Sequence, residues 1–129
     1  MLEVRRDEMR RTEVWRSIQA VFRVYDALLT PTVGILPVEN SSDGGTLGPA
    51  TVQGRVVDRC IGWCLTHPLN FTGHPAASIP AGQSTEGLPV GLQVVTRRFM
   101  DGQLISLCRR IEEVRPWTGA LEAAVTRLG

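Results

Sequence analysis

The chain has 129 residues, of which 43% are hydrophobic and 21% charged, and its formal net charge is +1. This balance is typical of one globular domain, and a charge near zero provides no field that attracts nucleic acid or an anionic membrane. Neither is therefore an expected partner. All 14 basic residues are arginines, so a lysine general base, a Schiff base and a P-loop lysine are excluded from this chain.

The sequence contains no run of about 18 apolar residues that would predict a membrane span. Its charged start, MLEVRRDEMRR, lacks the apolar core of a secretory signal. The three cysteines are an odd number, which favours reduced thiols over disulfides in a chain without an export signal. Together these features predict a cytoplasmic protein.

The first half of the chain predicts one helix, one strand and an irregular region. Apolar residues recur at spacings of three and four toward the end of residues 3–25, which indicates a helix with one buried face. The short apolar stretch 26–30, ended by Pro31, suits a buried strand. Residues 39–49 are rich in turn formers and predict an exposed loop, and a short helix is expected at 51–59.

The second half predicts two strands followed by a helix. Residues 76–80 and 90–96 suit strands, and the Gly- and Pro-containing segment between them is short enough for a hairpin-like return. Asp101 is an expected N-cap for a helix over 101–114, and a weaker helix is expected at 118–127. Three short strands between helices predict an α/β structure that is part of a larger layered fold.

Glycines and prolines around these strands predict specific backbone roles. Gly73 and Pro75 bracket a tight turn, and the Asn70 side chain is suited to hold that turn by bonding nearby backbone groups. Gly87, with Pro89, fixes the return between the last two strands, and Gly91 is expected to permit close approach of a neighbouring backbone.

Three passages in this order resemble the closing third of the amidase signature family. They are YDALLTPT at 25–32, LNFTGHPAASIPAG at 69–82 and GLPVGLQVV at 87–95, and the resemblance covers roughly residues 14–117. It implies a partial amidase-signature fold, α/β, with short strands of a mixed sheet flanked by helices. It also implies that residues 1–129 are the C-terminal part of an amidase domain, without its catalytic N-terminal part.

The resemblance implies a chemistry that this sequence does not hold by itself. Amidase signature enzymes act on carbon–nitrogen amide bonds through an acyl-enzyme, with a Ser–Ser–Lys triad and a Gly/Ser-rich segment that supplies oxyanion donors. The chain has no lysine, and its nearest Gly/Ser-rich text, NSSDGG at 40–45, lies in the wrong place relative to the strands. We therefore assign no catalytic residue, cofactor or metal, and expect the chain alone to be inactive. In an intact enzyme its substrate would be a small amide.

Two other functions are weighed against an amidase segment. An accessory module would dock onto a separate catalytic chain through an exposed sheet edge. A self-contained hydrolase would need a triad of Ser78, His74 and Asp58, but Ser78 falls inside a predicted strand, which disfavours this interpretation.

The segment before the second motif contains residues that suit a metal or a substrate. A zinc site is disfavoured because the ligand spacing departs from the usual pattern and one member belongs to the turn motif; its ligands would be Cys60, Cys64, His67 and His74. The resemblance implies that this segment runs near the mouth of a substrate channel, so Trp63 and His67 are the candidate channel-lining residues. An aromatic side chain packed in a core loop is the simpler interpretation and stays open beside it.

Overall fold

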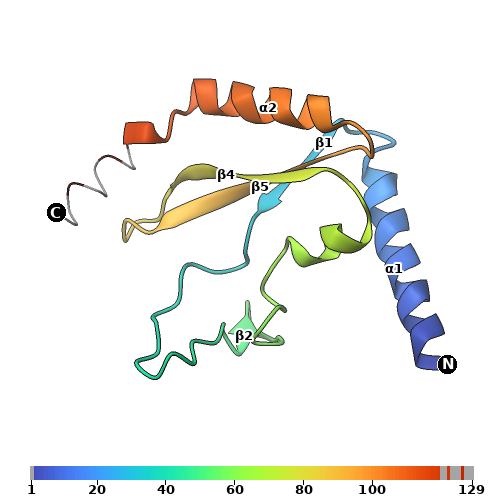
Figure 1. Cartoon of the computed structure of the whole chain (residues 1–129), viewed down its shortest axis with the longest axis horizontal. Coiled ribbons are helices and arrows are strands. Elements are labelled where there is room, and N and C mark those ends of the chain that lie inside the picture. Colours follow the sequence, from blue (N-terminus) through green and yellow to red (C-terminus); the bar gives the residue numbers. More distant parts are fainter. Residues whose placement is uncertain (1, 120–121, 123–125, 127–129) are drawn as a thin grey trace.

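The structure is a computed structural model that describes residues 2–119, 122 and 126, with only the backbone described for residues 2–6. A three-stranded sheet lies between two helices and a short 3-10 helix (Figure 1). The helices are α1 (Leu2–Val21), η1 (His67–Phe71) and α2 (Asp101–Val114), and the sheet strands are β1 (Ala27–Pro31), β4 (Ala76–Gln83) and β5 (Pro89–Thr96).

Strand β5 is the centre of the sheet, with β1 on one side and β4 on the other, and both pairs are antiparallel. The register places Gln93 of β5 opposite Thr30 of β1 and Ser78 of β4. Figure 1 shows α2 running along one face of this sheet, while η1 and the end of α1 lie toward the other face. Strands β1 and β4 are therefore the two edges of the sheet within the described residues.

Each face of the sheet has its own apolar cluster, because successive side chains of β5 point to opposite faces. Val94 packs with Leu104 and Cys108 of α2 on one face, and Val95 packs with Phe22 and Leu69 on the other. Burial, reinforced by the nearby charge of Glu112, raises the pKa of the Cys108 thiol. Cys108 is thus a small apolar core residue, not a reactive thiol.

The predicted α/β class and its strands are confirmed, with shifted ends, although the sheet within the described residues is antiparallel and not mixed. The strand expected at 26–30 is β1, the one expected at 76–80 extends to Gln83, and the one expected at 90–96 begins at Pro89. The helix predicted over 101–114 has those bounds, but its N-cap is Met100 and not Asp101. Asp101 lies in the first turn, where its carboxylate interacts favourably with the helix dipole.

The first helix is shorter than predicted, and one expected helix is absent. Helix α1 ends at Val21 because the aromatic and β-branched residues that follow form a turn leading into β1. The helix expected at 51–59 is wrong: β2 (Thr51–Val52) and β3 (Arg55–Val56) form a hairpin there. Its turn residues Gln53 and Gly54 have φ of 48° and 76°, as a two-residue hairpin requires. Most of the helix expected at 118–127 lies outside the described residues.

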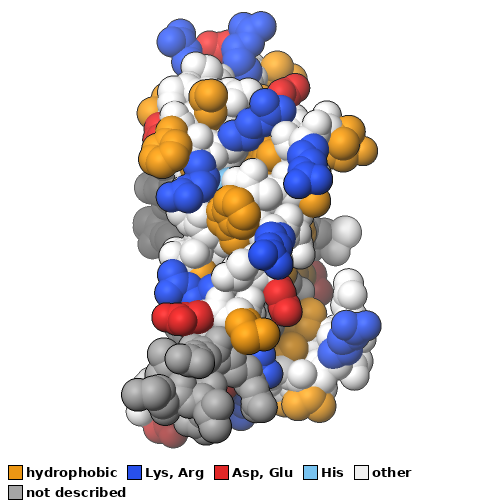
Figure 2. Space-filling view, turned by 90° about the vertical axis from the view of Figure 1, so that its right-hand side faces the viewer, with side chains coloured by type: hydrophobic (Ala, Val, Ile, Leu, Met, Phe, Trp, Pro, Cys, Tyr) orange, Lys and Arg blue, Asp and Glu red, His pale blue; other side chains and the backbone are white. Residues whose placement is uncertain are grey.

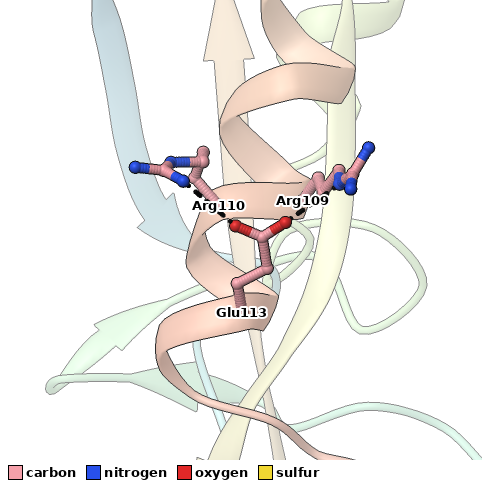
Figure 3. A network of polar contacts seen from close by, with 3 residues as sticks. All are labelled: Arg109, Arg110 and Glu113. Atoms are coloured by element: carbon pink, nitrogen blue, oxygen red, sulfur yellow. Dashed lines mark hydrogen bonds and ion pairs between the residues drawn. The ribbon is translucent and has the colours of Figure 1, made fainter.

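The outer surface of α2 carries a small ion-pair network (Figure 3). Glu113 accepts hydrogen bonds from Arg109 at 3.0 Å and from Arg110 at 3.2 Å. Each arginine side chain is about 80% exposed, so each pair contributes at most about 0.5 kcal/mol. The apolar face of α2, not this network, attaches the helix to the sheet. None of the helices within the described residues is long and apolar enough to cross a membrane.

Candidate functional site

The indole of Trp63 is fixed by backbone contacts across the segment between β1 and β4. Its Nε1–H donates to the carbonyl of Arg59 at 3.0 Å. The same carbonyl accepts the N–H of Gly48 at 2.9 Å, and Arg59 Nε donates back to the Gly48 carbonyl at 2.9 Å. A Cβ at position 48 would lie 2.0 Å from the indole nitrogen. The loop predicted at 39–49 is exposed except for Gly48, which is buried, and Pro49, which is half-buried. Gly48 is buried because Trp63 lies on it.

Trp63 borders a mostly apolar cavity of about 220 Å³ beside the start of β5. The other walls are Val33, residues 35–38 and residues 89–91. A cavity of roughly 150 Å³ is enough to hold a benzene ring. The cavity therefore has the size and the surface for an aryl group or a short acyl chain.

Gly91 lies at the edge of this cavity, where two hydroxyl groups meet across β5. Thr32 Oγ1 and Ser78 Oγ are 2.6 Å apart. A Cβ on Gly91 would lie 2.6 Å from Thr32 Oγ1 and 3.2 Å from Ser78 Oγ. Gly91 was expected to permit close approach of a neighbouring backbone. The atoms that occupy the space a side chain would need are instead these two side-chain hydroxyls.

The next row of the sheet is also polar. The Gln93 side chain is 2% exposed, and its Nε2 donates to Thr30 Oγ1 at 2.9 Å and to the Leu65 carbonyl at 3.3 Å. The second bond ties the segment that carries Trp63 to the centre of the sheet. Because buried amides are costly when unpaired, these bonds specify where that segment lies.

The structure separates the two predicted channel residues. Trp63 borders the cavity, whereas His67 lies in η1, where its ring packs edge-on against Phe71 with ring centroids 4.9 Å apart. Residues 35–38 also line this cavity, but the sequence did not predict it. These apolar residues follow a strand and show no periodicity that would mark them as part of a site.

The turn after η1 differs in its polar contacts from the prediction. Gly73 has a φ of +66°, so its glycine is required by backbone conformation. No hydrogen bond of the Asn70 side chain is found within the described part of the chain. The turn is held by Thr72, whose N–H and hydroxyl both donate to the Leu69 carbonyl at 3.2 Å.

His74 is a buried histidine that stacks on Phe22 with ring centroids 5.3 Å apart. Its Nε2 lies 3.1 Å from Gln19 Nε2, and its Nδ1 has no hydrogen-bond partner among the described residues. Burial lowers the pKa of His74 below its ordinary value near 6.5, and the positive charge of Arg98 lowers it further. The buried ring is therefore neutral at pH 7.

We predict that the free energy of unfolding of this chain falls as pH is lowered from 7.5 to 5. The unfolded state protonates His74 below about pH 6.5, whereas the folded state resists protonation until the lower folded pKa is reached. Urea unfolding at several pH values measures the slope. His74→Gln is expected to flatten it, and His67→Gln, which leaves His74 as the sole histidine, should not. An equal slope in wild type and His74→Gln would contradict the prediction.

The structure does not assemble the hydrolase triad weighed from the sequence. The Ser78 hydroxyl bonds Thr32, and the His74 ring lies beside Gln19. Asp58 Oδ1 instead accepts the N–H groups of Cys60 and Ile61 at 2.8 and 3.1 Å. Each of the three residues is thus engaged elsewhere. Within residues 2–119, 122 and 126, no three potential ligands form a metal-binding group.

Comparisons with known proteins show to which family this chain is similar. The Amidase family model matches residues 2–105. AmiC of Mycobacterium leprae, named as an amidase, is 40% identical over 110 residues, which are 84% of this chain and 22% of that protein. One of the polypeptides of the glutamyl-tRNA(Gln) amidotransferase of Granulibacter bethesdensis is 35% identical over 112 residues, 84% of this chain and 20% of that protein.

A solved structure has almost the same backbone. The crystal structure of a bacterial aryl acylamidase of the amidase signature family superposes with a TM-score of 0.91 at 38% identity. The superposition covers 95% of this chain and 25% of that enzyme. The chain thus spans about a fifth to a quarter of the length of the proteins it matches. It belongs to the amidase family and corresponds to the C-terminal segment of the amidase signature fold.

Proposed function

We propose that this chain forms the C-terminal part of a cytoplasmic amidase that acts on carbon–nitrogen amide bonds, and that its 129 residues alone hydrolyse no amide. The observation that carries the proposal is the backbone agreement with the aryl acylamidase, at a TM-score of 0.91 over 95% of the chain. The absence of lysine supports the second part, since the family's serine nucleophile needs a lysine base.

In the intact enzyme the contribution of this segment is a wall of the substrate pocket. Trp63 borders an apolar cavity, and its indole N–H donates to the Arg59 carbonyl. Two further bonds, one of them from the Arg59 side chain, join Arg59 to Gly48 beside the ring. The cavity suits the aryl or acyl part of a small amide. His67 supports the segment from η1, where it packs on Phe71 outside this cavity.

The catalytic part would dock against an edge of the sheet. Strands β1 and β4 each pair on one side only within the described residues, so the outer backbone groups of both are open to a further strand. The same feature supports the alternative in which the chain is an accessory module on a separate catalytic polypeptide. In both cases the partner supplies the serines and the lysine.

A segment exchange tests the proposed function. The residues of this chain replace the superposing quarter of the aryl acylamidase, and hydrolysis of an aryl acylamide is measured for the chimera and for the isolated chain. We expect turnover by the chimera and none by the isolated chain. A folded chimera without activity would refute the proposed amidase function, and turnover by the isolated chain would refute its dependence on a partner.

In that chimera, Trp63→Ala is expected to raise KM for an aryl acylamide by about tenfold with little change in kcat, because one aromatic contact of roughly 1 kcal/mol or more is lost. Trp63→Phe should retain most of the affinity. Trp117→Ala, which removes a tryptophan that bonds Glu112 instead, is the matched control. An unchanged KM with a lowered melting temperature would show that Trp63 is structural only.

A further inference from the structure

A second recess, separate from the Trp63 cavity, lies between α1 and the turn that follows η1. It is open to solvent and has a volume of about 640 Å³, its lining is mainly polar, and it shares no lining residue with the Trp63 cavity. The α1 wall provides Arg11, Thr12 and Trp15, and the opposite wall provides Asn70 and Arg98. The recess thus brings together two arginines from distant parts of the sequence.

Neighbouring groups position both guanidinium groups. Arg98 lies over the backbone of Gly73, where a Cβ would be 3.3 Å from its Nε, and its Cζ is 5.1 Å from the centre of the Phe99 ring. Arg11 lies over Phe71, with its Cζ 5.6 Å from the ring centre. Packing of this kind reduces the side-chain entropy that a long arginine would lose on binding a ligand.

The charges of the recess do not balance. Glu8 is the single acid on the lining, against the two arginines. The ion pairs found within the described residues involve Arg97, Arg109 and Arg110. The Asn70 amide has no hydrogen-bond partner in the same part of the chain. Figure 2 shows this side of the molecule, where basic side chains lie among hydrophobic ones.

We propose that this recess binds an oxyanion, the carboxylate or phosphate group of a ligand, between Arg11 and Arg98. A guanidinium presents a planar set of donors that matches either group, and a charge-assisted bond is about twice as strong as a neutral one. The Asn70 amide supplies a further donor from the same wall as Arg98. The proposal does not depend on the amidase activity.

Titration of the 129-residue chain tests the site, with inorganic phosphate and malonate as separate probes at constant ionic strength. Side-chain NMR signals of Arg98 Nε, the Asn70 amide and the Trp15 indole report binding. We expect saturable shifts of these signals with at least one probe, and the preferred probe identifies the ligand as a phosphate or a carboxylate. Arg11→Gln and Arg98→Gln should each weaken binding about tenfold. Arg110→Gln, on the outer surface of α2, is the matched control and should bind as wild type.

Further variants keep the test decisive if Arg98→Gln lowers the melting temperature. Arg98→Lys retains the charge but not the planar set of donors, so intermediate weakening is expected. Arg11 lies on the exposed side of α1, and its replacement leaves both apolar clusters intact. Absence of saturable binding by both probes would overturn the proposal, as would wild-type affinity in the folded Arg11→Gln and Arg98→Lys variants.

Discussion

Replacing Gly91 by valine is expected to lower the free energy of unfolding of this chain by about 2–4 kcal/mol. The first atom of the new side chain would lie 2.6 Å from Thr32 Oγ1 and 3.2 Å from Ser78 Oγ. The two hydroxyls, now 2.6 Å apart, would have to separate, and β1 would be pushed from β5 near their shared end. Urea unfolding monitored by circular dichroism measures the loss.

Gly102→Ala is the matched control, because a Cβ at that position of α2 meets nothing within 4 Å. It should be neutral or stabilise the chain by up to about 1 kcal/mol, as alanine favours a helix over glycine. A second comparison places Gly91→Val in a Thr32→Ala, Ser78→Ala background, where the loss should shrink because the hydroxyls are gone. A full, unchanged loss in that background would show that the cause lies elsewhere, for example in the strand backbone.

The elements that could be predicted from the sequence are those whose signal is local. Helix α2 carries its apolar stripe and first-turn carboxylate within 14 residues, so both its ends were predicted. The strands β4 and β5 are bounded by glycines and prolines that determine turns by themselves. Gly87, with a φ of +81°, is one such position, and there the backbone requirement agrees with the prediction.

The hairpin of β2 and β3 was missed for a physical reason. Its strands have two residues each, too few to show the alternation by which a strand is recognised. The signal that would have found it is the Gln53–Gly54 pair, which follows two β-branched residues, Thr51 and Val52. Positive φ at both positions of the pair suits a two-residue turn. A helix assignment there neglected the low helix propensity of Thr51, Val52 and Val56.

The candidate site was predictable only in part, because its contacts join segments distant in the sequence. Trp63 could be selected from its place before the second motif, but its cavity is closed by residues 35–38 and 89–91. The role of Gly91 depends on which side chains of β1 and β4 flank β5, and register is a tertiary property. The Gly48–Trp63 contact likewise joins an irregular loop to a turn.

The second prediction with a large effect concerns the contact between α2 and the sheet. Leu104→Ala is expected to lower the free energy of unfolding by about 2–5 kcal/mol, since it removes buried methyl groups and leaves a cavity. Leu104 is 7% exposed and packs with Ile79, Val94 and Cys108. Urea unfolding of the variant and wild type gives the difference.

Ile105→Ala, at the next position of the same helix, is the control because Ile105 is 68% exposed and should cost less than about 1 kcal/mol. The difference between the two losses in unfolding free energy shows whether α2 and the sheet form a packed core in the isolated chain. Equal losses for Leu104→Ala and Ile105→Ala would mean that α2 does not pack on β5 in solution as described. In the amidase chimera the same Leu104→Ala change should lower the melting temperature and leave KM unaltered. The reason is that α2 packs on the face of the sheet opposite Gln93 and Gly91, and the Trp63 cavity lies on their side.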